Sequence, residues 1–152
     1  MVKMDFPPLV HYKTTEEYKR HFESTYCRNK IFTFDQIRVF FRKQKFGHVF
    51  YESENHDGKK DIFSLERAQR INWIKFTLEH PEALLFQGWN NKLRNYTPNR
   101  RVSVVYEPFV VVIEIMPKKI PAITAEFITA YVADNSIERI KNSPKWSIEL
   151  LY

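Results

Sequence analysis

Residues 102–133, VSVVYEPFVVVIEIMPKKIPAITAEFITAYVA, decide the fold class of this chain. Residues 102–106 predict a strand that Pro108 ends, and residues 109–116 are β-branched on both faces, as is typical of a central strand. Residues 122–133 alternate with period two and predict a further strand. The last third of the chain is therefore expected to form a sheet whose strands follow one another in sequence.

The chain before this segment carries mainly helical signals. Capping residues, including the capping boxes of residues 14–17 and 33–36, precede three stretches whose apolar residues recur at helical spacing. The predicted helices begin at the caps Thr14, Thr33 and Ser64, and end near Cys27, before Gly47 and near Glu79. Between the second and third helix, residues 47–53 alternate with period two and predict a strand.

Runs of helix followed by runs of strands are typical of the α+β class. We expect one domain, residues 1–152, in which N-terminal helices pack on a four- or five-stranded antiparallel sheet. Its predicted parts are an extended lead-in at residues 1–13, a mainly helical region with one strand at residues 14–80, the sheet at residues 84–133, and a short helix and tail at residues 134–152.

Composition limits the classes of function. The 152 residues hold 24 Lys and Arg against 18 Asp and Glu, a formal net charge of +6, so nucleic acid is the first partner class to consider. The three glycines lie too far apart for the common phosphate-binding loops, and a single cysteine, Cys27, excludes an internal disulfide framework and a multi-cysteine zinc site. No apolar run approaches the roughly 20 residues of a membrane-spanning helix, and the first residues lack the apolar stretch of a secretory signal. The sequence thus predicts a cytoplasmic protein without a membrane partner, a cofactor or a metal.

Arg67 is the most informative single residue. In the helix that follows Ser64, a step of about 100° per residue places Arg67 inside the apolar stripe and Arg70 on its edge. A buried unpaired charge is expensive, so this guanidinium requires oxygen partners. The partner is either a carboxylate, Glu52 or Glu114, in a structural ion pair, or a phosphate clamped at the end of the sheet.

His48 lies at the start of the strand predicted before that helix. Histidine can both accept and donate a proton near neutral pH, so His48 is either a candidate catalytic residue or a hydrogen-bonded structural imidazole. Glu52 lies on the same face of the predicted strand and is the candidate for the second member of an acid/base pair. The remaining histidines lack the spacing of metal ligands.

Two stretches combine basic and aromatic residues without an acidic one. In residues 38–46 the predicted helix assigns the rings to the core and the cations to a solvated face. The loop at residues 89–101 has less core to cover its rings, and cations beside aromatic rings are what single-stranded RNA sites use. The RNA-binding candidates are therefore Trp89, Lys92, Arg94, Tyr96, Arg100 and Arg101.

Thr129 and Tyr131 lie two residues apart in the last predicted strand, so their side chains share one face. Hydroxyl groups there can bind either a phosphate or neighbouring backbone.

The order of four motifs is informative: Gly47-His48-Val49-Phe50, then Phe63-Ser64-x-x-Arg67-Ala68 opening a helix, then Thr77-Leu78-x-x-Pro81 at its end, then Thr129-Ala130-Tyr131. This order resembles the barnase, EndoU, colicin and RelE-like superfamily of ribonucleases, and within it the nuclease domains associated with phages and mobile elements. The resemblance covers roughly residues 45–146. It implies a small metal-independent ribonuclease, often a toxin that acts on tRNA or mRNA and is held by an antitoxin or immunity protein. The site residues that it implies are His48, Arg67, Thr129 and Tyr131.

Metal-free RNA cleavage needs a base for the 2′-hydroxyl proton, cations for the charge that builds on phosphate, and an acid for the leaving 5′-oxygen. The expected roles are base or acid for His48, a phosphate clamp for Arg67 with Arg70, positioning for Thr129 with Tyr131, and additional charge from Lys59 and Lys60 in the Asp-Gly turn. If Glu52 instead neutralises Arg67, the site is inactive. Two other classes also fit the basic surface: an RNA-binding module without catalysis, and a regulatory protein that binds an acidic protein partner.

Overall fold

The computed structural model describes residues 5–53, 62–90, 94–96, 100–116, 123–134 and 136–151. The helical segments are α1 (Thr15–Phe22), a π-helical turn (Glu23–Cys27), α2 (Lys45–Val49), α3 (Leu65–Gln69), α4 (Ile71–Glu79), α5 (Ile137–Lys141) and a 3-10 turn (Ile148–Leu151). The strands are β1 (Ile31–Phe32), β2 (Arg38–Phe40), β3 (Tyr51–Glu52), β4 (Ile62–Phe63), β5 (Leu84–Gln87), β6 (Trp89–Asn90), β7 (Asn95–Tyr96), β8 (Arg101–Tyr106), β9 (Phe109–Ile115) and β10 (Thr124–Val132).

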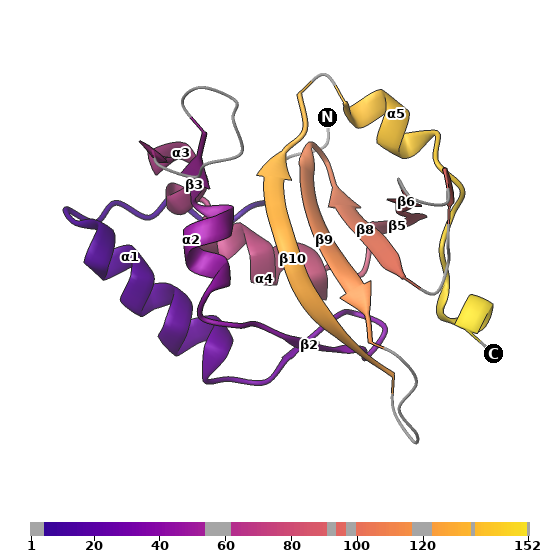
Figure 1. The fold of residues 1–152 in the computed structure, drawn as a ribbon, viewed down its shortest axis with the longest axis horizontal. Helices are drawn as coiled ribbons and strands as arrows, with labels where there is room; N and C mark the ends of the chain where they lie inside the picture. The colour runs from indigo at the N-terminus through magenta and orange to yellow at the C-terminus, as the bar shows by residue number, and fades with distance from the viewer. Residues whose placement is uncertain are drawn as a thin grey trace.

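The largest sheet is mixed and has six strands in the order β1-β2-β10-β9-β8-β5 (Figure 1). Strands β5, β8, β9 and β10 pair antiparallel, as the sequence predicts for residues 84–133. Strand β2 then pairs parallel with the start of β10, with Arg38 opposite Thr124. The sheet therefore has six strands and not the expected four or five, and one of its five pairings is parallel.

The extra strands, β1 and β2, lie within residues 31–40, and the helix predicted to begin at Thr33 does not form there. Gln36 has a φ of 72°, which a right-handed helix does not allow. The Thr33 hydroxyl accepts a hydrogen bond from the Ile37 backbone N–H at 3.0 Å, so this residue closes the turn between β1 and β2 instead of capping a helix. The same local hydrogen bonding that makes threonine a helix cap also makes it a turn residue.

Residues 47–53 also differ from the prediction, because α2 occupies the first part of the expected strand, residues 47–49. The buried side chains here are Phe46, Val49 and Phe50, and the spacing of three and four residues suits a helix. His48 is therefore on an exposed helix face and not in a strand. Only Tyr51 and Glu52 form a strand, paired with β4.

The helix predicted from Ser64 to Glu79 is divided at Arg70 into α3 and α4. Arg70 has φ −97° and ψ 21°, and its backbone N–H bonds the carbonyl of Arg67 at 3.1 Å. The carbonyl of Glu66, which that N–H would reach in a continuous helix, accepts instead from the Arg70 guanidinium at 2.8 Å. The side chain thus satisfies the acceptor that the break leaves open.

The first helix follows its prediction. Glu17 donates its backbone N–H to the Thr14 hydroxyl at 3.2 Å, and the Glu17 carboxylate accepts from the Thr14 backbone N–H at 3.1 Å, which completes a capping box. The π-helical turn carries the segment to Cys27, where the sequence predicts the end.

The main core lies between one face of the sheet and helices α1 to α4, and α4 passes behind β10, β9 and β8 in the view of Figure 1. We call this the inner face of the sheet. A smaller cluster on the opposite, outer face joins Phe86, Val105 and Val110 to Ile137 and Ile140 of α5. In the part of the chain that the structure describes, no helix is both long and apolar enough to cross a bilayer.

Candidate functional site

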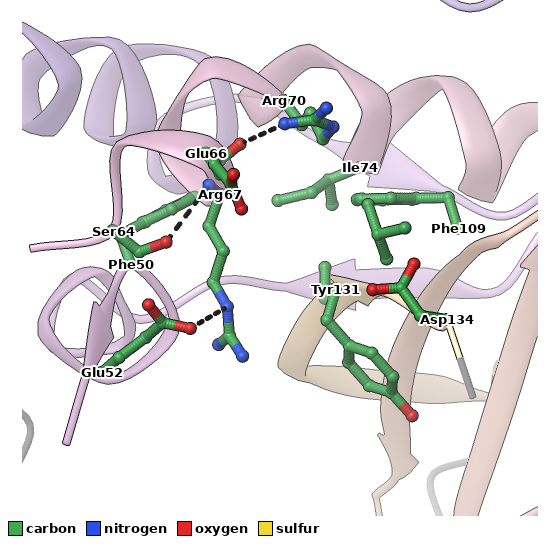
Figure 2. A pocket seen from close by; sticks show the side chains of 12 residues that line it. Phe50, Glu52, Ser64, Glu66, Arg67, Arg70, Ile74, Phe109, Tyr131 and Asp134 are labelled. Carbon is green, nitrogen blue, oxygen red and sulfur yellow. Dashed lines mark hydrogen bonds and ion pairs between the residues drawn. The ribbon is translucent and has the colours of Figure 1, made fainter. Parts of the chain in front are cut away.

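A pocket of about 330 Å³ opens where α3, β3 and the end of β10 meet (Figure 2). Its wall combines apolar side chains from the core with charged and hydroxyl groups. The lining residues are Phe50, Glu52, Ser64, Glu66, Arg67, Arg70, Ile74, Phe109, Ala130, Tyr131, Val132 and Asp134. We call this the Arg67 pocket.

Arg67 reaches the pocket from the first turn of α3. Ser64 caps this helix, with its hydroxyl 3.4 Å from the Arg67 backbone nitrogen. The guanidinium donates from Nη1 to the carbonyl of Val49 at 3.1 Å, and its Nε lies 3.8 Å from Oε1 of Glu52. The contact with Glu52 is long for a charge-assisted hydrogen bond, and the two side chains are 30% and 54% exposed. Of the two carboxylate partners considered from sequence, Glu52 is the one that contacts Arg67.

Arg70 lines the same pocket from the break between α3 and α4. Its guanidinium carbon lies 5.1 Å from the Trp73 ring centroid, a cation–π contact, and its Nη1 donates to the carbonyl of Glu66. Its Nε is buried and has no hydrogen-bond partner among the described residues. Arg70 is thus a positioned cation with one donor that the protein leaves unused there.

The pocket also carries three carboxylate side chains, Glu52, Glu66 and Asp134, against the two arginines. The sequence indicated only Glu52 of these three. Asp134 lies two residues after the last residue of β10, and its sequence signal was this position just after a strand end. A pocket with both charges suits proton transfer beside a stabilised anion better than simple retention of an anion.

Tyr131 shares the outer face of β10 with Thr129, as predicted, because the two residues pair with Val110 and Val112 of β9. An irregularity in the pairing lies between Phe127 and Thr129, so both residues come after it. Tyr131 lines the Arg67 pocket, whereas Thr129 does not. Burial raises the pKa of the Tyr131 hydroxyl, with Arg139 and Arg67 acting in the opposite direction, so this group remains a proton donor at neutral pH.

His48 does not line the Arg67 pocket, although its neighbour Val49 supplies the carbonyl that Arg67 binds. The side chain is exposed on α2. The predicted trio of His48, Arg67 and Thr129 therefore does not meet in this pocket, and Arg67 is joined there by Glu52, Arg70 and Tyr131.

The RNA-binding candidates of residues 89–101 lie elsewhere, since none of those that the structure describes lines the Arg67 pocket. Trp89 and Tyr96 pair in the β6–β7 hairpin, and Arg94 is exposed at its tip. Arg100 and Arg101 both direct their Nε to Oε1 of Glu114, at 3.5 and 3.2 Å. Lys59, Lys60 and Lys92 lie outside the described residues.

Searches of protein-family models, of curated proteins and of solved structures each return no match for this chain.

Proposed function

We propose that this chain is a metal-independent endoribonuclease, and that the Arg67 pocket is its active site. The observation that carries the proposal is that Arg67, Glu52 and Tyr131, which carry a guanidinium, a carboxylate and a phenol, all line one pocket. The motifs shared with the barnase, EndoU, colicin and RelE-like ribonucleases support the same conclusion, because Arg67 and Tyr131 belong to them.

The reaction assigns one task to each group. Glu52 takes the proton from a ribose 2′-hydroxyl, and the 2′-oxygen attacks the adjacent phosphorus. Arg67, with Arg70 beside it, binds the non-bridging oxygens as negative charge builds on them. The bond from phosphorus to the 5′-oxygen breaks, that oxygen receives a proton, and the products are a 2′,3′-cyclic phosphate and a free 5′-hydroxyl.

Two groups are candidates for the proton that the leaving 5′-oxygen receives. Tyr131 lines the pocket and keeps its proton at neutral pH because burial raises its pKa. His48 precedes Val49 in the chain, and the carbonyl of Val49 binds Arg67 at the pocket wall. An RNA strand that extends beyond the pocket would reach the His48 imidazole. Thr129, two residues before Tyr131 on the same strand face, is assigned to positioning of the strand. An activity that falls as the pH rises through the range in which an imidazole loses its proton would favour His48 as this acid.

The test is incubation of purified protein with total tRNA and with an mRNA transcript, with and without EDTA. We expect cleavage that EDTA does not abolish and fragments that end in 2′,3′-cyclic phosphate. Arg67→Ala and Glu52→Gln should each lower the cleavage rate by about 10² to 10³, and Tyr131→Phe should lower it as well. Arg20→Ala is the matched control, because Arg20 is exposed on α1 and does not line the pocket, and it should cleave at the parental rate.

One specific observation favours a second candidate function, an RNA-binding module without catalysis. The Arg67–Glu52 contact and the excess of carboxylates weaken the attraction of the pocket for phosphate. Salt-dependent binding of RNA that stays intact in every condition would establish this alternative and overturn the nuclease.

The resemblance also leads us to propose a toxin role with an antitoxin or immunity protein as partner. Expression of the wild-type chain should then arrest growth, and Arg67→Ala should relieve the arrest.

A further inference from the structure

We infer that the uncovered part of the outer sheet face is a second RNA-binding surface, built around Phe40, which stacks the bases of a single strand that leads into the Arg67 pocket. The inference rests on the proposed function only for the identity of the ligand. Its evidence comes from the other face of the sheet and from residues that the sequence assigned to a helix.

The pairing of the strands defines which side chains stand on this face. Val39 and Ala125 are opposite each other and buried, so they belong to the inner face, and the residues on either side of them point outward. Phe40 and Glu126 are therefore neighbours on the outer face. Glu126 pairs in turn with Glu114, and Glu114 pairs with Arg101. One row thus crosses four strands, from Phe40 on β2 to Arg101 on β8.

This row is not covered by the small α5 cluster. Helix α5 packs over Val105, Val110 and Phe86, toward the other end of the sheet (Figure 1). Phe40 is 40% exposed and Phe32, which pairs across β1 and β2 with Arg38, is 36% exposed. Aromatic rings at such exposure on a sheet are the platforms on which unpaired bases stack.

Arginines accompany the rings. The guanidinium carbon of Arg38 lies 4.5 Å from the Phe40 ring centroid, and its Nε is buried with no hydrogen-bond partner among the described residues. A stacked ring and guanidinium together present a wider flat surface than either alone.

The net charge of this face has the sign that a phosphate backbone requires. Glu126 binds Arg42 at 3.2 Å, and Glu114 binds Arg101 at 3.2 Å and Arg100 at 3.5 Å. Each glutamate thereby holds at least one arginine in place, and these arginines offset the charges of the two neighbouring glutamates. Arg38, Arg42, Arg100 and Arg101 exceed the two glutamates by two positive charges, which suits a polyanion and disfavours a cationic partner.

The outer face of β10 leads from this row to the proposed active site. Glu126, Thr129 and Tyr131 follow one another along that face, and Tyr131 lines the Arg67 pocket. Tyr131 itself packs against the α5 cluster, so it marks the boundary of the uncovered face. A single strand that stacks on Phe40 would run past Glu126 and Thr129 to this boundary, where the Arg67 pocket begins.

The experiment measures binding by fluorescence anisotropy in an Arg67→Ala background, where cleavage is expected to be slower by about 10² to 10³. The probes are a labelled single-stranded RNA 12-mer, the same sequence as a duplex, and an abasic 12-mer of equal charge. Phe40→Leu removes the ring and keeps an apolar side chain. We expect it to weaken single-strand binding roughly tenfold and to leave binding of the abasic 12-mer unchanged. Phe32→Leu should act in the same direction.

Tyr12→Leu is the matched control, because Tyr12 is 37% exposed and contacts α1 residues away from this face. Arg42→Ala should weaken binding of both the RNA and the abasic 12-mer, since its role is charge. Thermal unfolding of each variant shows that it is folded.

Three outcomes overturn the inference. In the first, Phe40→Leu binds the single strand as tightly as its parent. In the second, the duplex or the abasic 12-mer binds as tightly as the single strand. In the third, poly-glutamate competes as well as RNA, which would identify an acidic protein as the occupant. Failure of the nuclease proposal looks different. In that case the chain with Arg67 intact binds the single strand in a Phe40-dependent way and never cleaves it.

Discussion

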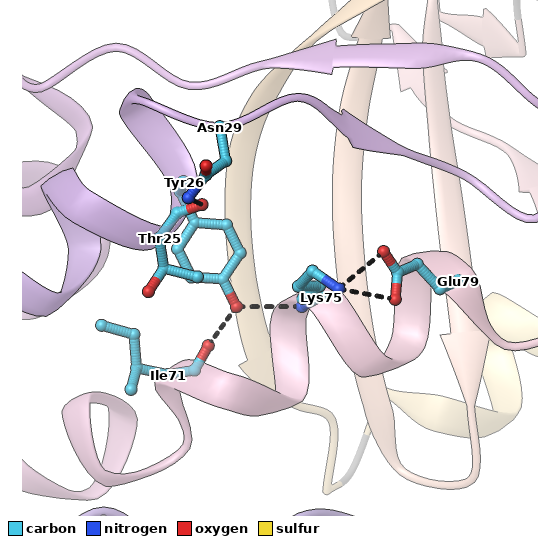
Figure 3. A network of polar contacts seen from close by, with 6 residues as sticks. All are labelled: Thr25, Tyr26, Asn29, Ile71, Lys75 and Glu79. Atoms are coloured by element: carbon cyan, nitrogen blue, oxygen red, sulfur yellow. Dashed lines mark hydrogen bonds and ion pairs between the residues drawn. The ribbon is translucent and has the colours of Figure 1, made fainter.

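At the scale of single residues, Tyr26 connects the N-terminal helical segment to α4. Its hydroxyl donates to the carbonyl of Ile71 at 2.5 Å and accepts from the backbone N–H of Lys75 at 3.0 Å (Figure 3). These two backbone groups are the ones that pair with each other in an uninterrupted α-helix. The buried phenol therefore adds a tertiary contact to the hydrogen-bond ladder of α4.

Removal of this hydroxyl tests the connection. Tyr26→Phe should lower the free energy of unfolding by about 1 kcal/mol, because two hydrogen bonds to the phenol disappear while Ile71 and Lys75 can still pair. Urea denaturation measures the change. Tyr12→Phe, at an exposed hydroxyl that bonds His21, should change stability by less than about 0.5 kcal/mol. Equal effects of the two variants would contradict the role given to Tyr26.

The buried phenol of Tyr26 should also make the stability of the protein depend on pH. Burial raises the pKa of this phenol well above its ordinary value of about 10, more than the Lys75 N–H lowers it. Above pH 10 the unfolded chain therefore releases this proton while the folded chain keeps it. Stability should fall by about 1.4 kcal/mol per pH unit from this residue. Urea midpoints at pH 9, 10 and 11 should show a shallower decline in Tyr26→Phe, and parallel declines would refute the prediction.

Replacement of Gly88 and of Gly47 by alanine should change stability in opposite directions. A Cβ on Gly88 would lie 2.6 Å from Cβ of Arg101 and 3.0 Å from its carbonyl oxygen, whereas a Cβ on Gly47 in α2 would meet nothing within 4 Å. Gly88→Ala should destabilise by about 1–3 kcal/mol because the β5 and β8 backbones must separate. Gly47→Ala should stabilise by about 0.5–1 kcal/mol through helix propensity. Thermal unfolding distinguishes them, and a stable Gly88→Ala variant would exclude the close approach.

The residues of the site show what a sequence can and cannot reveal. The helical period was enough to place Arg67 on an inward stripe and to require an oxygen partner for it, and the structure supplies Val49 and Glu52. The period could not choose between Glu52 and Glu114, because that choice depends on which strands become neighbours. The same limitation applies to Arg100 and Arg101, whose common partner Glu114 lies on the adjacent strand.

At the scale of elements, the side chain of Phe6 is one of several contacts that hold the N-terminal segment before α1. The Phe6 ring stacks on Trp73 at 4.2 Å and lies within 6.4 Å of Phe109, a residue that lines the Arg67 pocket. The Trp73 indole also donates to the carbonyl of Pro7 at 2.8 Å. The N-terminal segment therefore packs against Phe109, which forms part of the pocket wall.

Phe6→Ala should release this segment while the sheet remains folded. We expect faster hydrogen exchange at the Trp73 indole and at the Val10 N–H, which bonds Gln69 at 2.8 Å, and a decrease in stability of about 2–4 kcal/mol because the ring is half-buried. Exchange followed by NMR measures both sites. Leu65→Ala, at a side chain that is 50% exposed, is the control. Unchanged exchange would show that the segment is held by other contacts.

The elements differ in how well their sequences define them. The α1 capping box and the strands at residues 101–132 agree with prediction because their signals are local and long. The prediction for residues 33–50 is wrong for two reasons. Thr33 closes a turn instead of capping a helix, and the burial of Phe46, Val49 and Phe50 has helical spacing, in a helix that packs against β10. The break at Arg70 was not predictable, since a side chain supplies the hydrogen bond that a backbone N–H would have made.

At the scale of the whole molecule, the formal net charge of +6 should govern how tightly it binds nucleic acid. Arg100→Ala with Arg101→Ala should weaken RNA binding and flatten the slope of log affinity against log salt by about one for each phosphate that the variant no longer neutralises. Glu114→Gln should act oppositely, because it frees both guanidinium groups from their shared partner. Anisotropy titrations between 50 and 200 mM salt measure the slopes, and an unchanged slope would remove these arginines from the interface.

Only part of the sheet topology could be predicted from the sequence. Consecutive strands predict an antiparallel arrangement of β8, β9 and β10, and that arrangement is present. Nothing local in residues 38–40 marks them as a partner for residues 124–126, because the two segments are far apart in the chain and the pairing involves three residues on each side.

Because β2 pairs with β10, the segment that must fold together is longer than the segment that carries the proposed active site. The motifs on which the proposed resemblance to ribonucleases rests begin at Gly47, which invites excision of a shorter fragment from that point onward. Such a fragment would lack β2, so the first residues of β10 would present an unsatisfied edge, and it would lack the buried rings of Tyr18, Phe22 and Tyr26. Engineers who shorten, fuse or permute this protein must therefore keep its first forty-odd residues, although none of those that the structure describes lines the pocket.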